Sequence, residues 1–222
     1  MSARLMFPDP QAAADLLTFA SRAVRLGDGV VRLRAAAGVL VTTAAPLAPR
    51  GLLDATPTVL GLRISEVDPE LECDLGVEAS ALSLAPDDAS AIVLPETAVA
   101  PAWAGISPPR GGWEQTASLD SSILAARAQY GIAAVADALP ADPGEDVVRT
   151  VRGQVWGQPD EQLGGLPLGT AFAAFALGFI AGAEQATVRS SGAWTRVTLN
   201  RGHVLVRGPV RSGLTAVRST GR

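Results

Sequence analysis

The stretch Val30-Val-Arg-Leu-Arg-Ala-Ala-Ala-Gly-Val-Leu-Val-Thr-Thr43 holds two runs rich in β-branched residues on either side of a small-residue turn. Such residues favour strands, and the glycine of the 35–38 segment suits a tight hairpin turn. A third run of the same kind follows at residues 58–64. The three runs predict that the first third of the chain forms an antiparallel sheet.

Residues 66–78 alternate between acidic and apolar side chains. The carboxylates lie at even positions, and Val67, Leu71, Cys73, Leu75 and Val77 lie at odd ones. In a strand this period of two places the carboxylates on one face, and Pro69 favours an edge position. We expect a solvated acidic face rather than a metal site, with Cys73 as a buried, unreactive thiol.

The remaining elements complete an α+β plan, a mainly antiparallel sheet built from N-terminal and C-terminal hairpins and covered by about four helices. A hairpin is also expected across residues 79–94. Helices are predicted at about 10–26, 119–139, 145–155 and 166–182, and C-terminal strands at 186–189, 194–199 and 203–207. We expect residues 1–222 to form a single globular unit, with 1–118 (β-rich) and 119–222 (helical with C-terminal hairpins) as its two lobes. The sequence shows no internal repeat.

Composition excludes several kinds of chemistry. The 222 residues include eighteen basic residues, all arginine, and only one histidine (His203) and one cysteine (Cys73). Without lysine there is no Schiff-base catalysis and no lysine-bearing phosphate loop, and no Cys/His zinc cluster fits in one chain. No catalytic constellation is found, so we predict no catalytic residue, no metal and no cofactor, and favour a protein that is not an enzyme.

Residues 163–183 are uncharged, yet glycines and Pro167 interrupt them, so a buried helix is expected and a membrane span is not. The N-terminus lacks the pattern of a secretory signal. A single cysteine suits a reducing compartment. The expected localisation is therefore cytoplasmic.

Charge is divided unevenly along the chain. Residues 1–184 carry all twenty-two carboxylates and eleven arginines, whereas residues 185–222 carry seven arginines and no carboxylate. We expect these arginines to pair with the carboxylates of residues 66–78, within the chain or in a second copy. The alternative is a basic hairpin that binds nucleic acid, but the aromatic residues of a base-stacking surface are missing there.

The proline-rich loop from Trp103 to Trp113 is the strongest candidate for a recognition surface, because long ordered loops often carry function. The candidate ligand-binding residues are Trp103, Arg110, Trp113, Arg196 and Arg207. His203 is expected to be a solvent-facing strand residue, since no serine elbow accompanies it.

Three segments carry a resemblance. These are Trp103-Ala-Gly-Ile-Ser-Pro-Pro-Arg-Gly-Gly-Trp113-Glu114, Leu166-Pro-Leu-Gly-Thr-Ala-Phe-Ala-Ala-Phe-Ala-Leu-Gly-Phe179, and Trp194-Thr-Arg-Val together with Arg201-Gly-His-Val-Leu-Val-Arg207. The chain resembles a conserved family of high-GC actinobacteria that has no assigned activity. The resemblance implies a cytoplasmic globular protein and transfers no catalytic residue.

Three functions stay open at this point. A soluble, non-enzymatic interaction or scaffold protein is expected first, with self-association or a protein partner and without nucleic acid or membrane binding. The alternative is a small anionic-ligand binder or an enzyme that uses the Trp103–Trp113 loop. The further alternative is nucleic-acid binding through the C-terminal arginines.

Overall fold

The computed structural model describes residues 4–51, 54–105 and 107–208, and it confirms the α+β class. The helices are α1 (Pro10–Ala23), α2 (Ser121–Ala138), α3 (Glu145–Gly157) and α4 (Gly169–Ala176). The strands are β1 (Arg4–Met6), β2 (Val30–Ala36), β3 (Val39–Leu47), β4 (Thr58–Glu66), β5 (Cys73–Glu78), β6 (Ser83–Ala85), β7 (Asp88–Val93), β8 (Glu114–Asp120), β9 (Gln185–Ser191), β10 (Trp194–Leu199) and β11 (Gly202–Arg207). Short 3₁₀ turns are η1 (Ala79–Ala81), η2 (Ala102–Gly105) and η3 (Glu161–Leu163).

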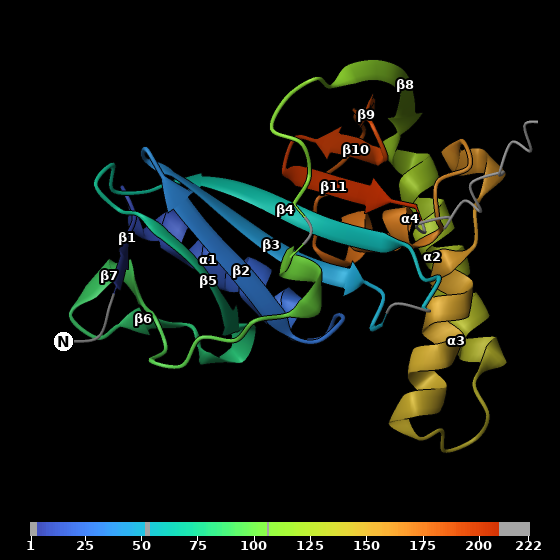
Figure 1. The fold of residues 1–222 in the computed structure, drawn as a ribbon, viewed down its shortest axis with the longest axis horizontal. Helices are drawn as coiled ribbons and strands as arrows, with labels where there is room; N and C mark the ends of the chain where they lie inside the picture. The colour runs from blue at the N-terminus through green and yellow to red at the C-terminus, as the bar shows by residue number, and fades with distance from the viewer. Residues whose placement is uncertain (1–3, 52–53, 106, 209–222) are drawn as a thin grey trace, which may run out of the picture.

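Eight strands form one continuous antiparallel sheet in the order β5-β2-β3-β4-β11-β10-β9-β8, and β1, β7 and β6 form a smaller one. The hairpin predicted across residues 30–43 is confirmed, with Val31 opposite Ala44 and Ala36 opposite Val39. Its turn places Ala37 and Gly38 at positive φ. The N-terminal and C-terminal strands therefore belong to the same sheet (Figure 1).

The order of the elements repeats although the sequence does not, while the pairing of the first strand differs, since β1 pairs with β7 in the small sheet and β8 pairs with β9 in the large one. A strand, a helix and a three-stranded meander follow one another as β1-α1-β2-β3-β4, and a second such unit is β8-α2-β9-β10-β11, with α3 and α4 inserted after α2. The last strand of each unit pairs with the last strand of the other, so Leu62 lies opposite His203 and Thr58 opposite Arg207. The β4–β11 junction thus joins the two units edge to edge.

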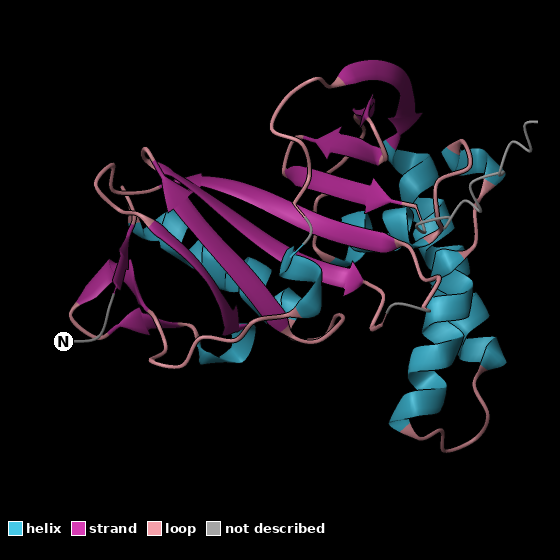
Figure 2. Ribbon diagram, viewed as in Figure 1, coloured by secondary structure: helices cyan, strands magenta, loops and turns pink. Residues whose placement is uncertain are grey.

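Helices α1 and α4 lie against the large sheet, while α2 and α3 pack on α4 and extend beyond the end of the sheet (Figure 2). Helix α1 packs against β2, β3 and β4, helix α4 packs against β4 and β11, and α2 packs against α4. Phe179 is fully buried in this layer and stacks on Phe19 at 6.2 Å between ring centroids. A β-carbon at Gly202 would lie 2.4 Å from the Phe179 ring, so the strand reaches this ring only with glycine there.

The opposite face of the sheet has a small core of its own. Its buried residues are Val30, Ala45, Leu60, Trp103, Trp194 and Leu205. Part of the connection between β7 and β8 covers it, instead of helices. The sheet is therefore buried on both faces, by different kinds of structure.

Two predicted elements differ from the structure. The alternating segment 66–78 is not one strand: β4 ends at Glu66, a turn follows, and β5 begins only at Cys73. The Asp68 carboxylate accepts the backbone N–H of Glu70, so the acidic residues before position 73 lie in a turn. Cys73 is partly buried rather than buried, and burial raises the pKa of its thiol.

The helix expected at 166–182 is shorter, because α4 ends at Ala176. Gly178 has a φ of +73°, and a β-carbon there would lie 1.9 Å from the Arg22 guanidinium. Arg22 Nη1 donates to the carbonyl oxygen of Leu177 at 2.8 Å, which satisfies the end of the helix. In the 79–94 region the hairpin is β6 with β7, while residues 79–81 form the turn η1.

Candidate functional site

The connection between β7 and β8 is fixed to the sheet at its first half. The backbone N–H of Val99 donates to the carbonyl oxygen of Gly76 at 2.8 Å. Trp103 is 5% exposed, and its Nε1 donates to Asp28 Oδ2 at 2.8 Å. These contacts place Trp103 as a structural anchor on the sheet.

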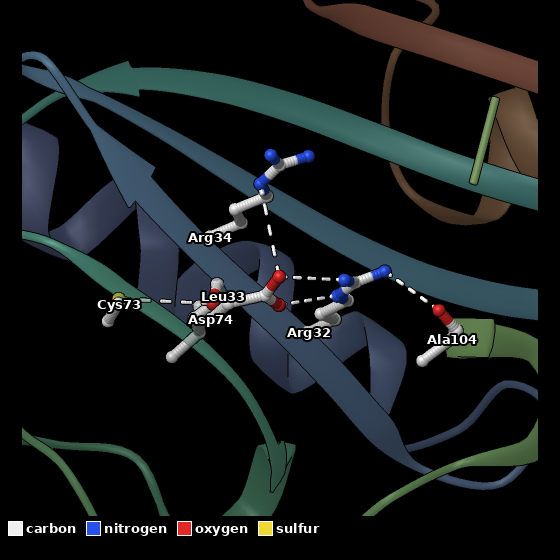
Figure 3. A network of polar contacts seen from close by, with 6 residues as sticks. All are labelled: Arg32, Leu33, Arg34, Cys73, Asp74 and Ala104. Atoms are coloured by element: carbon white, nitrogen blue, oxygen red, sulfur yellow. Dashed lines mark hydrogen bonds and ion pairs between the residues drawn. The ribbon is translucent and has the colours of Figure 1, made fainter. Parts of the chain in front are cut away.

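An ion pair between Arg32 and Asp74 strengthens this attachment (Figure 3). Arg32 Nε and Nη2 donate to the two oxygens of Asp74 at 2.7 and 2.8 Å, and Arg32 Nη1 donates to the carbonyl oxygen of Ala104 at 2.8 Å. The hydrogen bond from Arg32 holds the pKa of Asp74 below its usual value. Arg34 approaches the same carboxylate at 3.9 Å. One side chain thus ties β2, β5 and the η2 turn together.

The second half of the connection meets β10 through Trp113. Arg196 Cζ lies 4.6 Å from the centroid of the Trp113 ring, and Trp113 Nε1 donates to the carbonyl oxygen of Pro109 at 3.1 Å. Burial, followed by the charge of Arg189, lowers the pKa of Arg196. A stacked, half-buried arginine without a carboxylate suits cation–π packing.

His203 differs from its expected solvent-facing position. It is partly buried, and one ring nitrogen lies 3.1 Å from Thr198 Oγ1. Burial lowers the pKa of His203 most, and the charges of Arg196 and Arg189 lower it further. The neutral imidazole is therefore the favoured form on this face of the sheet.

The structure brings together only some of the predicted ligand-binding residues. Trp113 and Arg196 are in contact, Trp103 is bonded instead to Asp28, and Arg110 is exposed. Arg207 pairs in register with Trp194 and Thr58 at the end of β11.

The expected pairing of the C-terminal arginines with residues 66–78 does not occur within the chain among the described residues, and their pairing with a second copy stays a prediction. Arg32 and Arg34 pair with Asp74, whereas Arg189, Arg196, Arg201 and Arg207 form no ion pair among residues 4–51, 54–105 and 107–208. The remaining arginines of this group, Arg211, Arg218 and Arg222, lie outside the described residues, as does the tail expected there.

Strand β8 forms one edge of the large sheet. It pairs only with β9 in the described sheet, and Glu114 to Ser118 are exposed. A bulge at Thr116 interrupts the register, after which Ala117 to Asp120 pair regularly with β9. An edge strand presents unpaired backbone groups to a further strand, and a bulge bends it away from indiscriminate pairing.

The helix layer carries little net charge. Helix α1 has one acidic and one basic residue, Asp15 and Arg22, and Asp15 pairs with Arg63 on β4 at 2.6 Å. Helix α2 has Arg127 and Asp137, and Arg127 pairs with Asp160 at 2.5 Å. The exposed side of these helices therefore lacks the positive electrostatic potential that a protein needs to bind many phosphate groups tightly.

A groove follows α3. Two adjoining hollows of about 500 and 570 Å³ lie between this helix and the segment that leads from β3 towards β4. They share the lining residues Leu47, Ala48, Arg50, Arg149 and Gly153. Positions 145, 148, 149, 152 and 153 follow helical spacing, which explains why they share one face of α3.

Arg152 lines the first hollow and has no carboxylate partner among the described residues. Its guanidinium lies 5.7 Å from the Phe172 ring centroid, and burial lowers its pKa. Trp156, the one residue of α3 that is fully buried, stacks on Phe172 and anchors the helix. The fixed helix thus presents a half-buried cation to an open groove.

Two further findings concern the described residues alone. None of their histidine, cysteine and carboxylate side chains gather in a group that could hold a metal ion. No helix among them has both the length and the apolar character needed to cross a bilayer.

Sequence reasoning missed the surfaces at β8 and α3. Strand β8, Glu-Gln-Thr-Ala-Ser-Leu-Asp, has few strong strand formers, so only its place between a glycine pair and a capped helix could have indicated it. The α3 face could have been found from Arg149, Arg152 and Gly153, an arginine pair beside a glycine at helical spacing.

Both halves of the chain match families described as domains of unknown function. DUF8010 matches residues 1–105, and DUF8185 matches residues 108–211. No curated protein matches the sequence. The boundary between the two families falls in the connection that covers the sheet, whereas the predicted boundary of the two lobes near residue 118 stays a prediction.

The architecture is similar to that of a solved structure described as a DNA polymerase III beta subunit. A chain described as a DNA polymerase III beta subunit from Eubacterium rectale is 11% identical with a TM-score of 0.50, over 92% of this chain and 64% of that one. A DNA polymerase sliding clamp from Caulobacter crescentus is 15% identical, with a TM-score of 0.47 over 100% of this chain and 69% of that one. The DnaN sliding clamp from Bartonella birtlesii is 13% identical, with a TM-score of 0.49 over 94% and 65%. This chain therefore spans less than two thirds of the Eubacterium rectale chain.

This likeness corrects the predicted function. The prediction of a soluble, non-enzymatic interaction or scaffold protein is wrong. Its alternatives, an anionic-ligand binder or enzyme at the Trp103–Trp113 loop and nucleic-acid binding by the C-terminal arginines, did not anticipate this fold either. The sequence did not suggest the likeness in fold to a DNA polymerase III beta subunit. This likeness counts against the prediction that nucleic acid is not a partner.

Proposed function

We propose that the chain is a clamp-type assembly module that joins further copies of itself through β8 and, once assembled, acts on DNA. The observation that carries this proposal is the exposed edge strand at one end of an eight-stranded sheet. The sheet already continues across one junction between units, where β4 pairs with β11. A further unit added at β8 would extend the same sheet in the same way.

The fold likeness supports this assignment. The Eubacterium rectale protein is described as a beta subunit of DNA polymerase III, and this chain matches 64% of its length.

The weakly charged helix layer is compatible with such a role. A ring that encloses a duplex is held by its topology and does not need many phosphate contacts, whereas an open binder depends on them. The near-balance of charges on α1 and α2 therefore favours enclosure by an assembly over direct adhesion of one chain.

Analytical ultracentrifugation across a concentration series tests the proposal. We expect reversible self-association of the wild-type chain, and at least about tenfold weaker association when Thr116→Lys and Ser118→Lys place two lysines on the free edge. A wild-type chain that stays monomeric at every concentration overturns the assembly.

The matched control places two lysines on another edge. Ser83→Lys and Leu84→Lys alter the exposed edge strand β6 of the small sheet. Association should be unchanged in this control. Equal weakening in both variants would show that added charge, and not the β8 edge, is responsible.

A further inference from the structure

We infer that the groove along α3 binds an extended, acidic segment of a partner protein, with a partner carboxylate on Arg152 and an apolar side chain beside Leu47 and Val148. This site goes beyond the assembly proposed above. It is formed within one chain and does not require β8.

The shape of the groove fits a peptide. The lining residues run along α3 from Glu145 to Gly157 and on to Pro159, which at 1.5 Å per residue gives a length of about 20 Å. An extended chain rises about 3.3 Å per residue, so about six residues would fill it. The two hollows adjoin and are partly open to solvent. An extended peptide needs such a continuous, open groove, whereas a small metabolite is usually enclosed in a single pocket.

The charges of the groove select an acidic partner. Arg50, Arg149 and Arg152 line it, and Arg149 already pairs with Asp146 on the same helix. Arg152 has no such partner in the part of the chain that the structure describes, and it is partly removed from water, which makes a carboxylate a favourable ligand for it. Its guanidinium lies 5.7 Å from the Phe172 ring centroid, and a planar guanidinium can bind a carboxylate through two parallel hydrogen bonds.

Two of the three carboxylates that line the groove, those of Asp28 and Asp54, are occupied elsewhere, and the third belongs to Glu145 at the start of α3. Asp28 accepts the Trp103 Nε1–H and the backbone N–H of Val30. Asp54 accepts the backbone N–H groups of Arg50 and Thr56, which together with the Thr56 side chain lowers its pKa. These anions satisfy the backbone of the groove walls and do not neutralise Arg152.

The same anions disfavour a nucleic acid in the groove. A phosphate chain that follows α3 would pass Asp54 and Glu145 as well as the arginines. An alternation of carboxylates and arginines repels a uniformly charged backbone, while a peptide can place one carboxylate at one arginine. The occupant is therefore a protein segment.

The backbone keeps the groove open. Gly27 has a φ of +57°, and a β-carbon there would lie 2.0 Å from the carbonyl oxygen of Ala45, so glycine lets this turn pack against the end of β3. On α3, a β-carbon at Gly153 would lie 3.7 Å from Thr56 Oγ1, in ordinary contact. A leucine at position 153 would extend further into the space that both hollows share.

Phage-displayed random dodecapeptides on the immobilised full-length chain test the inference. We expect the selected peptides to be enriched in aspartate and glutamate together with a large apolar residue. For the best synthetic peptide, fluorescence anisotropy should show about tenfold weaker binding to Arg152→Met and to Gly153→Leu. Arg152→Met keeps an apolar stem near Phe172, and Gly153→Leu blocks the groove without removing charge.

The control is Arg34→Met, which removes an arginine of the sheet face, outside the groove. Binding should be unchanged there, and circular dichroism should show the same helix content in all variants. No selected peptide, selected peptides without acidic enrichment, equal binding by Arg152→Met and Arg34→Met, or displacement by duplex DNA would each overturn the inference. If the β8 lysine variant no longer self-associates but still binds the peptide, the result supports a peptide groove that is independent of the assembly.

Discussion

The two faces of the large sheet are buried in different ways. On one face α1 and α4 supply a continuous layer around Phe19 and Phe179. On the other, a few anchors such as Trp103 and Trp113 hold one irregular connection against the strands. Helices bury a face cooperatively, whereas a connection held at separate points can open locally without unfolding the sheet.

Phe179→Ala should have the largest effect on stability. The ring is fully buried among strands and helices, so its removal leaves a cavity that the glycine-lined strands cannot fill. We expect a loss of about 4 kcal/mol in the free energy of unfolding, measured by urea denaturation. A loss below about 1 kcal/mol would show that the helix layer is not the main core.

Trp103→Ala should destabilise the opposite face by about 3 kcal/mol, because it removes a large buried ring and its bond to Asp28. The comparison predicts a local effect. Hydrogen exchange should accelerate across residues 95–105, with a much smaller change in β3 and β4. Uniform acceleration through the whole sheet would contradict the independence of the two faces.

Arg32→Met should lower the free energy of unfolding by about 1 kcal/mol at neutral pH, because the Arg32–Asp74 ion pair is partly exposed. The bond from Arg32 lowers the folded pKa of Asp74 below its ordinary 3.8, so this stability is present above that value and is lost as the pH falls further. The variant should therefore lose less stability than the wild type in acid. Parallel urea denaturation at several acidic pH values checks this, with Arg25→Met as the control, because the exposed Arg25 forms no ion pair among the described residues.

His203→Gln should have the smallest effect, confined to a pH range. Burial lowers the folded pKa of His203 below its ordinary 6.5, so the unfolded chain binds the proton more readily and the wild type loses stability as the pH falls below 6.5. The variant should lose part of this dependence between about pH 7 and pH 5. Identical pH profiles would place His203 in a more solvated environment.

The sequence predicted the elements whose signals are local. The hairpin at residues 30–43 combines two β-branched runs with Gly38, and Asp9-Pro10 marks the start of α1 because the Asp9 carboxylate accepts the N–H of Ala12. The alternation of acidic and apolar residues at 66–78 wrongly predicted one continuous strand, because a turn between two strands can keep the same period of two in its sequence. Gly178 ended α4 early, within a segment whose apolar residues continue.

The candidate surfaces depended on pairing over long distances. Nothing in the composition of β4 and β11 identifies them as partners, and the exposed edge of β8 exists only once β9 has been placed. The role of Arg152 likewise depends on the segment opposite α3, which contributes Leu47 and Arg50. Such arrangements are set by tertiary packing and leave no periodic signal.

The β4–β11 junction also sets an order of events during synthesis. Leu62 must wait for His203, which is made about 140 residues later, a delay of roughly 7 to 30 s at the usual rates of translation. Until then β4 ends the nascent sheet with an apolar, unpaired edge, which is a template for aggregation. The first half, folded alone, therefore exposes a strand edge that is covered only when the last strand of the second half is added.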